Sequence, residues 1–510
     1  MKKMRSIAVV AGSILIASNA LGLLAGCSNN RNIEKVDHTK TQFHIGNFDG
    51  GYGHAWIEKA ADLFEERYAE KEFESGKKGV QIWINNAKDE YSEYIFYQTI
   101  AGLPQDFFVA PIPRAEITDN KLLISLNDII DEPMTEFGEE KTIREKLSDY
   151  YKEAYQFDKL ATATAEGEAL YYLPTAEAFF GNIVYDVDLF ETKGYFISKD
   201  GGWTQGENKS VGMDGIAGTY DDGVGMKIYN TLEGEYVIPG DAEATVFNGY
   251  NFYDAQRHPG RLAALKTTEK LIKDGETYGY YSSDAFKDTQ THTKAQNEFL
   301  ISAKNESRIA MLIEGAWWES EATETFSLMS NRYDAKYSKK NRKLGVMPTF
   351  RVNGSVGEKS NFLTSNQALF INGNTSHVEL AKTFMKFLLS NEIRELFTDV
   401  TGVPSPYDYQ LSPTTYNNLS NFGKNLWEIH ENKNGMFHNV TEMRTSKAYH
   451  ENRSAYPQSF QTLVGKVKTT CPFTAFKFDG LTAQTYYDGI ISYANKQYDD
   501  NYATKHGARA

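Results

Sequence analysis

The feature that most constrains the fold is an alternation of short apolar strands with amphipathic helices near the start of the chain. Strands are predicted at residues 41–46, 80–84 and 106–110, and helical patterns at 57–68 and 91–101 lie between them. Strands and helices that alternate at this length form βαβ units, whose strands run parallel in one sheet. The pattern therefore predicts an α/β fold built on a mainly parallel sheet.

Further strands are predicted at 171–174, 179–185, 308–313, 344–348 and 367–371. The first two leave the initial βαβ unit, so the chain is expected to pass there into a second unit. A chain of 510 residues is also longer than a usual single domain, and two or three domains are expected.

Two later helices are well signalled, at 262–274 and 376–390, and residues 411–510 are expected to be mostly helical. At the start of the second helix, Ser376 and Glu379 have the spacing of a capping box. The apolar stripe predicted along that helix consists of Val378, Ala381, Met385 and Leu388.

Residues 198–245 interrupt this rhythm, because they are rich in Gly and Asp and have no apolar period. We expect an irregular insertion with turns there. Its carboxylates Asp214, Asp221 and Asp222 lie on a glycine-rich loop of a kind that can bind Ca²⁺. The spacing does not match an EF-hand loop, so a metal-free acidic turn is the favoured alternative.

The N-terminal segment has the layout of a secretory signal. Lys2, Lys3 and Arg5 precede an almost wholly apolar stretch from Ile7 to Leu24, and small residues then lead to Cys27. This order resembles a bacterial lipoprotein signal, in which the chain is cut before the cysteine and the cysteine carries fatty acyl chains such as palmitate. An uncleaved membrane-spanning anchor is the alternative.

The resemblance implies a signal peptide at 1–26, a lipid anchor at Cys27 and a flexible tether over 27–40, on the extracytoplasmic face of a bacterial cell membrane. The only other cysteine, Cys471, then has no partner. An exported chain without disulfides depends on core burial for its stability, and this chain is large enough for that.

The charge balance narrows the classes of ligand. The net charge of −14 becomes −17 when the three positive charges of the predicted signal are removed. An acidic surface disfavours nucleic acid and anionic substrates, but it does not exclude a small neutral ligand. The 32 Tyr residues offer flat apolar faces with polar tips, which suit sugars, although core packing explains such a surplus equally well.

Enzyme signatures are missing from the sequence. It contains no phosphate-binding glycine loop, no Gly-x-Ser-x-Gly elbow and no His-Glu-x-x-His helix, and its histidines show no metal-ligand spacing. The adjacent pairs Glu65-Glu66 and Glu139-Glu140 lie in helix-like polar patterns. We interpret them as solvated charge, with a glycosidase pair as the alternative.

The strongest positive element is the run from Ile313 through Glu314 and Gly315 to Trp317 and Trp318. An apolar strand ends, a glycine turns the chain, and two indoles emerge where a helix begins. Ligands of open α/β sheets bind beyond the carboxyl ends of the strands, and an indole can stack on the apolar face of a sugar ring. Adjacent helical residues point about 100° apart, so one indole can be core while the other lines a pocket.

Two further aromatic clusters are candidates for ligand contact. The loop after the first strand holds Asp49 and Tyr52, with Trp56 behind them, and a tight turn with Trp56 packed under a helix is the alternative. Asn86, just beyond the second predicted strand, joins this set. The second cluster follows the insertion and is a buried aromatic patch in the alternative interpretation; its candidates are Phe247, Tyr250 and Asn251.

The order of these elements resembles the extracellular solute-binding proteins of carbohydrate ABC importers, of the maltose-binding type. The resemblance is carried by the lipoprotein signal, the strand–Gly–Trp-Trp element, Leu344-Gly345-Val346-Met347-Pro348 and Thr401-Gly402-Val403-Pro404-Ser405. Tyr172-Leu173-Pro174 followed by Gly181 to Asp186 is similar to that family's passage between lobes. The resemblance covers nearly all of residues 41–510.

The family has two α/β lobes, joined by hinge-crossing strands, that close on a ligand. The resemblance implies that lobe 1 comprises 41–174 plus 362–410, and that lobe 2 comprises 178–358 plus 411–510. Trp317 and Trp318 match the family's stacking aromatic, and the loops that hold Asp49, Tyr52 and Arg114 would face the same cleft. Arg114 could donate a bidentate pair of hydrogen bonds to hydroxyls.

The implied function is binding and delivery without turnover: a monomeric receptor would hold a sugar or oligosaccharide and dock ABC permease subunits in the membrane. No cofactor is expected apart from the Ca²⁺ considered above. Two alternatives stay open. The same fold could bind a peptide or another non-sugar solute, or the chain could be a surface glycosidase.

Overall fold

The fold is described from a computed structural model of the chain. The structure describes residues 35–91, 100–111, 122–154, 170–177, 182–193, 196–197, 203–204, 259–279, 281–282, 284–287, 289–306, 308–347, 360–361, 367–431, 437–438 and 472–489. Within these ranges, no helix combines the length and the apolar character that crossing a bilayer requires.

A five-stranded sheet forms the first unit, in the order β4-β1-β5-β13-β6. Its strands are β1 (Thr41–Phe48), β4 (Val80–Ala87), β5 (Phe107–Pro111), β6 (Tyr172–Pro174) and β13 (Gln367–Ile371). The strands β4, β1 and β5 are parallel, and β13 runs antiparallel between β5 and β6. The predicted α/β class is confirmed, and the one antiparallel insertion comes from a strand far along the chain.

Both faces of this sheet are buried, and the alternation along β5 shows it. Phe107 packs edge-on against Phe384 on one face, while the next residue, Phe108, stacks on Phe370 on the other. Successive strand residues point to opposite faces, so adjacent aromatics enter separate apolar clusters. Such continuous apolar runs are typical of sheets covered on both sides.

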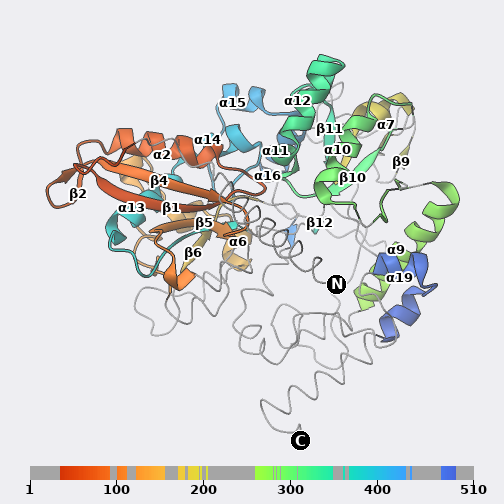
Figure 1. The fold of residues 1–510 in the computed structure, drawn as a ribbon, viewed down its shortest axis with the longest axis horizontal. Helices are drawn as coiled ribbons and strands as arrows, with labels where there is room; N and C mark the ends of the chain where they lie inside the picture. The colour runs from red at the N-terminus through yellow and green to blue at the C-terminus, as the bar shows by residue number, and fades with distance from the viewer. Residues whose placement is uncertain are drawn as a thin grey trace, which may run out of the picture.

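Three helices pack together against the first of these faces: α2 (Ala55–Arg67), α13 (Val378–Leu388) and α14 (Asn391–Thr401). Figure 1 shows α2 and α14 along the upper side of the sheet. The ring of Phe64 on α2 lies 5.0 Å from that of Phe384 on α13, which joins the two helices over the strands. Segments that are distant in sequence therefore build one unit.

The predicted capping box at the start of α13 is wrong. The residue before the helix is His377, and no side chain caps it. Instead, the Thr375 hydroxyl accepts from the His377 backbone N–H at 3.0 Å and donates to Asp106 Oδ1 at 2.5 Å. The start of the helix is thus tied to the residue before β5, a long-range contact that Ser376 and Glu379 could not signal. The buried stripe contains the predicted Ala381, Met385 and Leu388 but not Val378, which is partly exposed, and it adds Leu380, Phe384 and Phe387.

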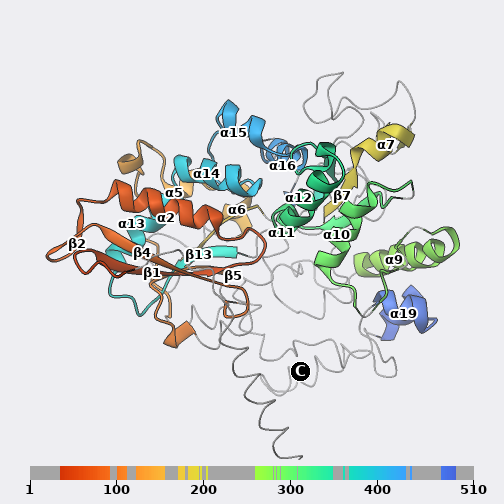
Figure 2. The ribbon, with the colours of Figure 1, turned by 45° about the horizontal axis from the view of Figure 1, so that its top comes forward.

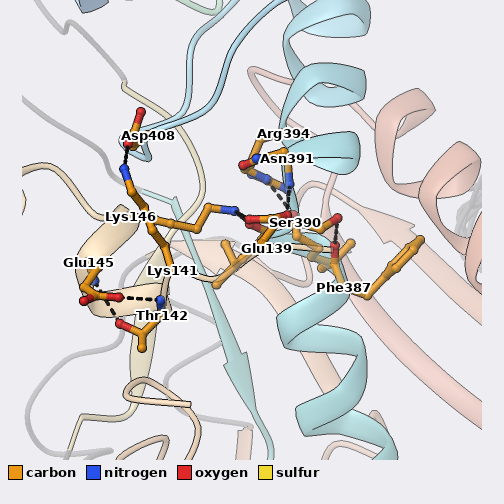
Figure 3. A network of polar contacts seen from close by, with 12 residues as sticks. Glu139, Lys141, Thr142, Glu145, Lys146, Phe387, Ser390, Asn391, Arg394 and Asp408 are labelled. Atoms are coloured by element: carbon orange, nitrogen blue, oxygen red, sulfur yellow. Dashed lines mark hydrogen bonds and ion pairs between the residues drawn. The ribbon is translucent and has the colours of Figure 1, made fainter. Parts of the chain in front are cut away.

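A buried ion pair holds the junction between α13 and α14 (Figure 3). Lys146 is 1% exposed, pairs with Glu139 and donates to the Leu389 carbonyl at 2.7 Å. Glu139 also accepts from the Asn391 backbone N–H at 2.7 Å, where the helix has no side-chain cap of its own. The interpretation of Glu139 as solvated charge is therefore wrong, because its carboxylate caps the N-terminus of α14.

The second unit is built on a three-stranded antiparallel sheet, in the order β10-β7-β11. Its strands are β7 (Asn182–Asp186), β10 (Met311–Glu314) and β11 (Leu344–Met347). Figure 2 shows it to the right of the first sheet, with helices around it. These helices are α7 (Val187–Lys193), α10 (His292–Ser302), α11 (Trp318–Glu321), α12 (Thr323–Arg332) and α16 (Asn421–Glu431).

The predicted strands at 41–46, 80–84 and 367–371 are confirmed with small shifts at their ends, and the predicted helix at 262–274 lies within α9. The proposed lobe boundaries stay a prediction.

The remaining elements are β2 (Glu72–Glu74), β3 (Lys77–Lys78), η1 (Ile100–Gly102), η2 (Thr135–Phe137), α5 (Ile143–Lys146), α6 (Asp149–Ala154), β8 (Phe196–Ile197), β9 (Trp203–Thr204), α9 (Pro259–Tyr278), η6 (Ala335–Tyr337), β12 (Ser360–Asn361), α15 (Pro413–Asn418), β14 (Phe437–His438) and α19 (Pro472–Phe478).

Candidate functional site

The two adjacent tryptophans at the end of β10 have different environments. Trp318 is fully buried, and its ring packs among three phenylalanines. Trp317 is half-buried and lies just before α11. The expectation that Trp318 contacts a ligand is therefore wrong, because its indole is part of the core of the second unit. The three rings around it are Phe299, Phe326 and Phe422.

Trp317 reaches from the second unit to the loop after β1 in the first. Its ring meets that of Tyr52 edge to face, with centroids 6.3 Å apart. A Cβ atom placed on Gly51 would lie 3.2 Å from the indole Cγ, and one placed on Gly315 would lie 2.4 Å from the indole ring. Both glycines thus make room for this indole, and Gly51 in addition has a φ of +65°.

The loop from Asp49 to His54 carries few side chains. Glycines occupy positions 50, 51 and 53, and the ring of Tyr52 is 4% exposed. Asp49 Oδ1 and His54 Nδ1 lie 2.9 Å apart, and both side chains are about one third exposed. The accessible polar groups of this loop are therefore one carboxylate and one imidazole.

A buried amide pair supports this loop from below. The Asn47 amide donates to Asn86 Oδ1 at 2.9 Å, and the Asn86 amide donates to Glu58 Oε1 at 3.1 Å. Asn86 is 3% exposed, so its predicted contact with a ligand is wrong in this conformation. Its amide instead joins β1, β4 and α2 beneath the loop.

Tyr52 is buried in the same way, against Phe397 of α14 as well as Trp317. Burial, followed by the charge of Glu177, raises the pKa of Tyr52 above its ordinary value. The predicted role of Tyr52 as a direct ligand contact is therefore wrong here. Its ring instead forms the apolar wall on which Trp317 rests.

Glu177, whose charge acts on Tyr52, follows β6 where the chain leaves the first sheet. Its backbone N–H donates to the Pro404 carbonyl at 2.8 Å. Its Oε1 lies 3.0 Å from Nδ1 of His430 on α16, and both side chains are nearly fully buried. The segment after β6 thus contacts both the segment after α14 and helix α16 of the second unit.

Glu314 lies on the other side of Trp317, at the end of β10. The Gln296 amide donates both to Glu314 Oε1 at 3.0 Å and to Glu321 Oε2 at 2.9 Å. Burial raises the pKa of Glu314, and the charge of Glu321 acts in the same direction. Glu314 is half-buried, so it stays a candidate ligand contact at the edge of the second unit.

The comparisons with known proteins agree with this architecture. No protein-family model matches the sequence, and no curated protein is similar to it in sequence. The structure of maltose-bound MalE3 of T. maritima aligns at a TM-score of 0.50 and 14% identity, over 89% of this chain and 99% of that one. The chain has the fold of the two-lobed, maltose-binding type of solute-binding protein.

Two more structures of this two-lobed fold align at a TM-score of 0.49. One is a chitin oligosaccharide binding protein, at 15% identity over 90% of this chain and 100% of that one. The other is the maltose-maltodextrin binding protein of Alicyclobacillus acidocaldarius, at 10% identity over 89% and 100%. The predicted fold class is confirmed by the alignment with MalE3 above.

Several predicted site residues lie outside the residues that the structure describes. In the part of the chain that is described, no group of three or more His, Cys, Asp or Glu side chains is arranged to hold a metal ion. The predictions that lie outside are Arg114, Phe247, Tyr250 and Asn251 for the ligand, Asp214, Asp221 and Asp222 for Ca²⁺, Cys27 for the lipid, and the unpaired Cys471.

Sequence reasoning missed three polar residues of the site: His54, Gln296 and Glu177. His54 ends a loop whose Asp49 was already a candidate, so the run Asp-Gly-Gly-Tyr-Gly-His contained a usable signal. The sequence gives no such signal for Gln296 or Glu177, because their partners lie 18 or more residues away and only the packing of the fold brings them close.

Proposed function

We propose that the chain is an extracytoplasmic receptor that binds a sugar or oligosaccharide between its two units and delivers it to an ABC permease. The observation that carries this proposal is the half-buried indole of Trp317, which meets the loop of Asp49 and His54 from the opposite unit. An aromatic face beside a carboxylate suits a ligand that is apolar on its faces and polar at its edges, as a pyranose is.

In the proposed mechanism, Trp317 supplies the stacking face, and Asp49 and Glu314 accept hydrogen bonds from ligand hydroxyls. These groups come from different units, so a ligand that touches both favours the closed arrangement through its higher affinity for it. Glu177 and His430 lie where segments pass between the units, and they would maintain the hinge while the units move.

The direct test is a thermal-shift screen of the full chain in detergent against a panel of glycans. A ligand at about 100 times its dissociation constant adds about 2.7 kcal/mol to the free energy of unfolding, which raises the melting temperature visibly. Stabilisation by peptides and by no glycan would instead support a receptor for another solute.

We propose no turnover. In a glycosidase, the candidate catalytic carboxylates would be Glu314 and Glu321, which both accept from the Gln296 amide. Incubation with the glycans that bind, followed by measurement of reducing ends, tests this. Product that appears at a catalytic rate would contradict a receptor without turnover.

The anchor and the partner are part of the same proposal. Cys27 would carry the lipid, and a tether would hold a monomeric receptor close to its permease, which raises its effective concentration there. Labelling of cells with a palmitate analogue, compared between the wild type and Cys27→Ser, tests the anchor. Uptake of a labelled glycan in the same two strains tests delivery.

Calcium binding by Asp214, Asp221 and Asp222 stays a prediction, with the metal-free acidic turn favoured. Melting of the full chain with added Ca²⁺ and with a chelator tests it. A melting temperature that does not differ between the two conditions would remove the calcium site.

A further inference from the structure

In the pair formed by Asp49 and His54, each side chain has a second polar atom that takes no part in the contact between them. Asp49 Oδ1 and His54 Nδ1 form a hydrogen bond of 2.9 Å. A carboxylate only accepts, so the hydrogen between them belongs to Nδ1, and Nε2 takes no part in this contact. Among the residues with described positions, neither His54 Nε2 nor Asp49 Oδ2 has a hydrogen-bond partner. The pair therefore offers two adjacent polar atoms, an imidazole nitrogen and a carboxylate oxygen.

The helix that follows does not use the imidazole. His54 is the residue before α2, where a side chain usually accepts from a backbone N–H of the first turn, yet the His54 side chain makes no such bond. Ser, Thr, Asp and Asn are the residues that favour this position, so a histidine there gains nothing for the helix. Its ring is instead turned to Asp49.

The surroundings keep the pair accessible. Among the described residues other than its chain neighbours, a Cβ placed on Gly53 would meet nothing within 4 Å, so no other described element packs on the backbone just before His54. On the other side, Gly51 touches the indole of Trp317. Asp49, His54 and the contact with Trp317 thus all belong to the loop of residues 49–54. The residues between Asp49 and His54 carry no exposed side chain.

We infer that His54 is a specificity-determining residue for the ligand. Two neighbouring hydroxyls of a sugar would form hydrogen bonds with Asp49 Oδ2 and His54 Nε2, while Trp317 stacks on the ring that carries them. The pair thus selects ligands with two adjacent hydroxyls, and a ligand without one of them leaves a polar atom of the pair unpaired. This inference rests on the proposed function.

The test compares the wild type with His54→Asn in the full chain in detergent. Asn suits the position before a helix, so the substitution removes Nε2 and spares α2. Isothermal titration uses the glycan that gives the largest thermal shift, together with its monodeoxy analogues. His38→Asn, an exposed histidine elsewhere, is the matched control.

We expect His54→Asn to weaken binding of the parent glycan about tenfold or more, without a decrease in the melting temperature of the free protein, because Asn can cap α2. One deoxy analogue should bind the wild type and His54→Asn equally well, since it lacks the hydroxyl that His54 contacts. His38→Asn should bind like the wild type.

Two results would overturn the inference while the proposed function stands: unchanged binding in His54→Asn, or an equal loss for the parent and every deoxy analogue. The second would mean that His54 only shapes the loop. If the wild type binds no glycan at all, the proposed function fails, and the inference fails with it.

Discussion

Trp317 rests edge to face on Tyr52, with ring planes at 86°, although the two residues follow strands of different sheets, β10 and β1. Tyr52 is in turn packed on Phe397 of α14, at 5.7 Å between ring centroids. The proposed stacking residue of the second unit is therefore positioned by an aromatic wall of the first. Any change in the spacing of the units alters the surroundings of this indole.

The adjacent tryptophans make a matched pair for mutation. Trp317→Ala should weaken binding of the glycan at least tenfold and change stability little, because its ring is half-buried. Trp318→Ala should lower the free energy of unfolding by about 3–5 kcal/mol, because it empties a core position. Titration calorimetry and chemical denaturation measure the two effects, and the reverse assignment would contradict the structure.

Gly51 and Gly53 provide a second matched pair, since their φ angles are +65° and +70°. Replacement of either by Ala carries the same backbone strain, about 1–2 kcal/mol. Only at Gly51 would the new methyl group meet the indole of Trp317. We expect equal losses of stability and a loss of glycan affinity in Gly51→Ala alone. Equal affinities in the two variants would argue against the contact.

Lys146 and Lys141 test the junction shown in Figure 3. Lys146→Met removes the donor to the Leu389 carbonyl and leaves Glu139 without its cation, so a loss of about 3–5 kcal/mol is expected. Lys141 pairs with Asp408 at the surface, and Lys141→Met should stay within about 0.5 kcal/mol of the wild type. Urea denaturation distinguishes them. Similar stabilities for both variants would exclude a capping role for Lys146.

Glu319 predicts a pH dependence of stability. It is 2% exposed, its Oε2 accepts from Ser420 at 2.6 Å, and its Oε1 has no partner among the described residues. Burial raises the pKa of Glu319 above its ordinary value of 4.5. The folded state thus favours the protonated form, so the ionised carboxylate destabilises the fold above the raised pKa. This penalty is relieved as the pH falls through that value.

The variant Glu319→Gln keeps the shape and removes the charge. We expect it to melt at a higher temperature than the wild type at pH 7.5, with a difference that shrinks as the pH approaches 4.5. Melting curves across this range measure the effect. A difference that grows on acidification would have the wrong sign and would exclude this explanation.

Much of the fold could be predicted because its signals are local. The strand predicted at 367–371 coincides with β13, and the alternation near the start of the chain produced the parallel strands β4, β1 and β5. The capping box of α13 failed for a physical reason. The backbone N–H of His377 is taken up by Thr375, whose hydroxyl also binds Asp106, 269 residues away in sequence.

The candidate site was predicted in part. Trp317, Asp49 and Glu314 are partly exposed, whereas Trp318, Tyr52 and Asn86 are buried. All six have residue types that suit sugar binding, so composition and spacing could not separate the two groups. Exposure depends on neighbours from distant segments: Phe422 covers Trp318, and Phe397 covers Tyr52.

By itself, the sequence determined the α/β class and the approximate place of the helices and strands, because the periods of apolar residues act over a few residues at a time. Only the tertiary structure decided which indole is core, that His54 turns to Asp49, and that Glu177 meets His430 between the units. Those choices depend on which segments the sheet order brings together, and local spacing carries no information about partners far along the chain.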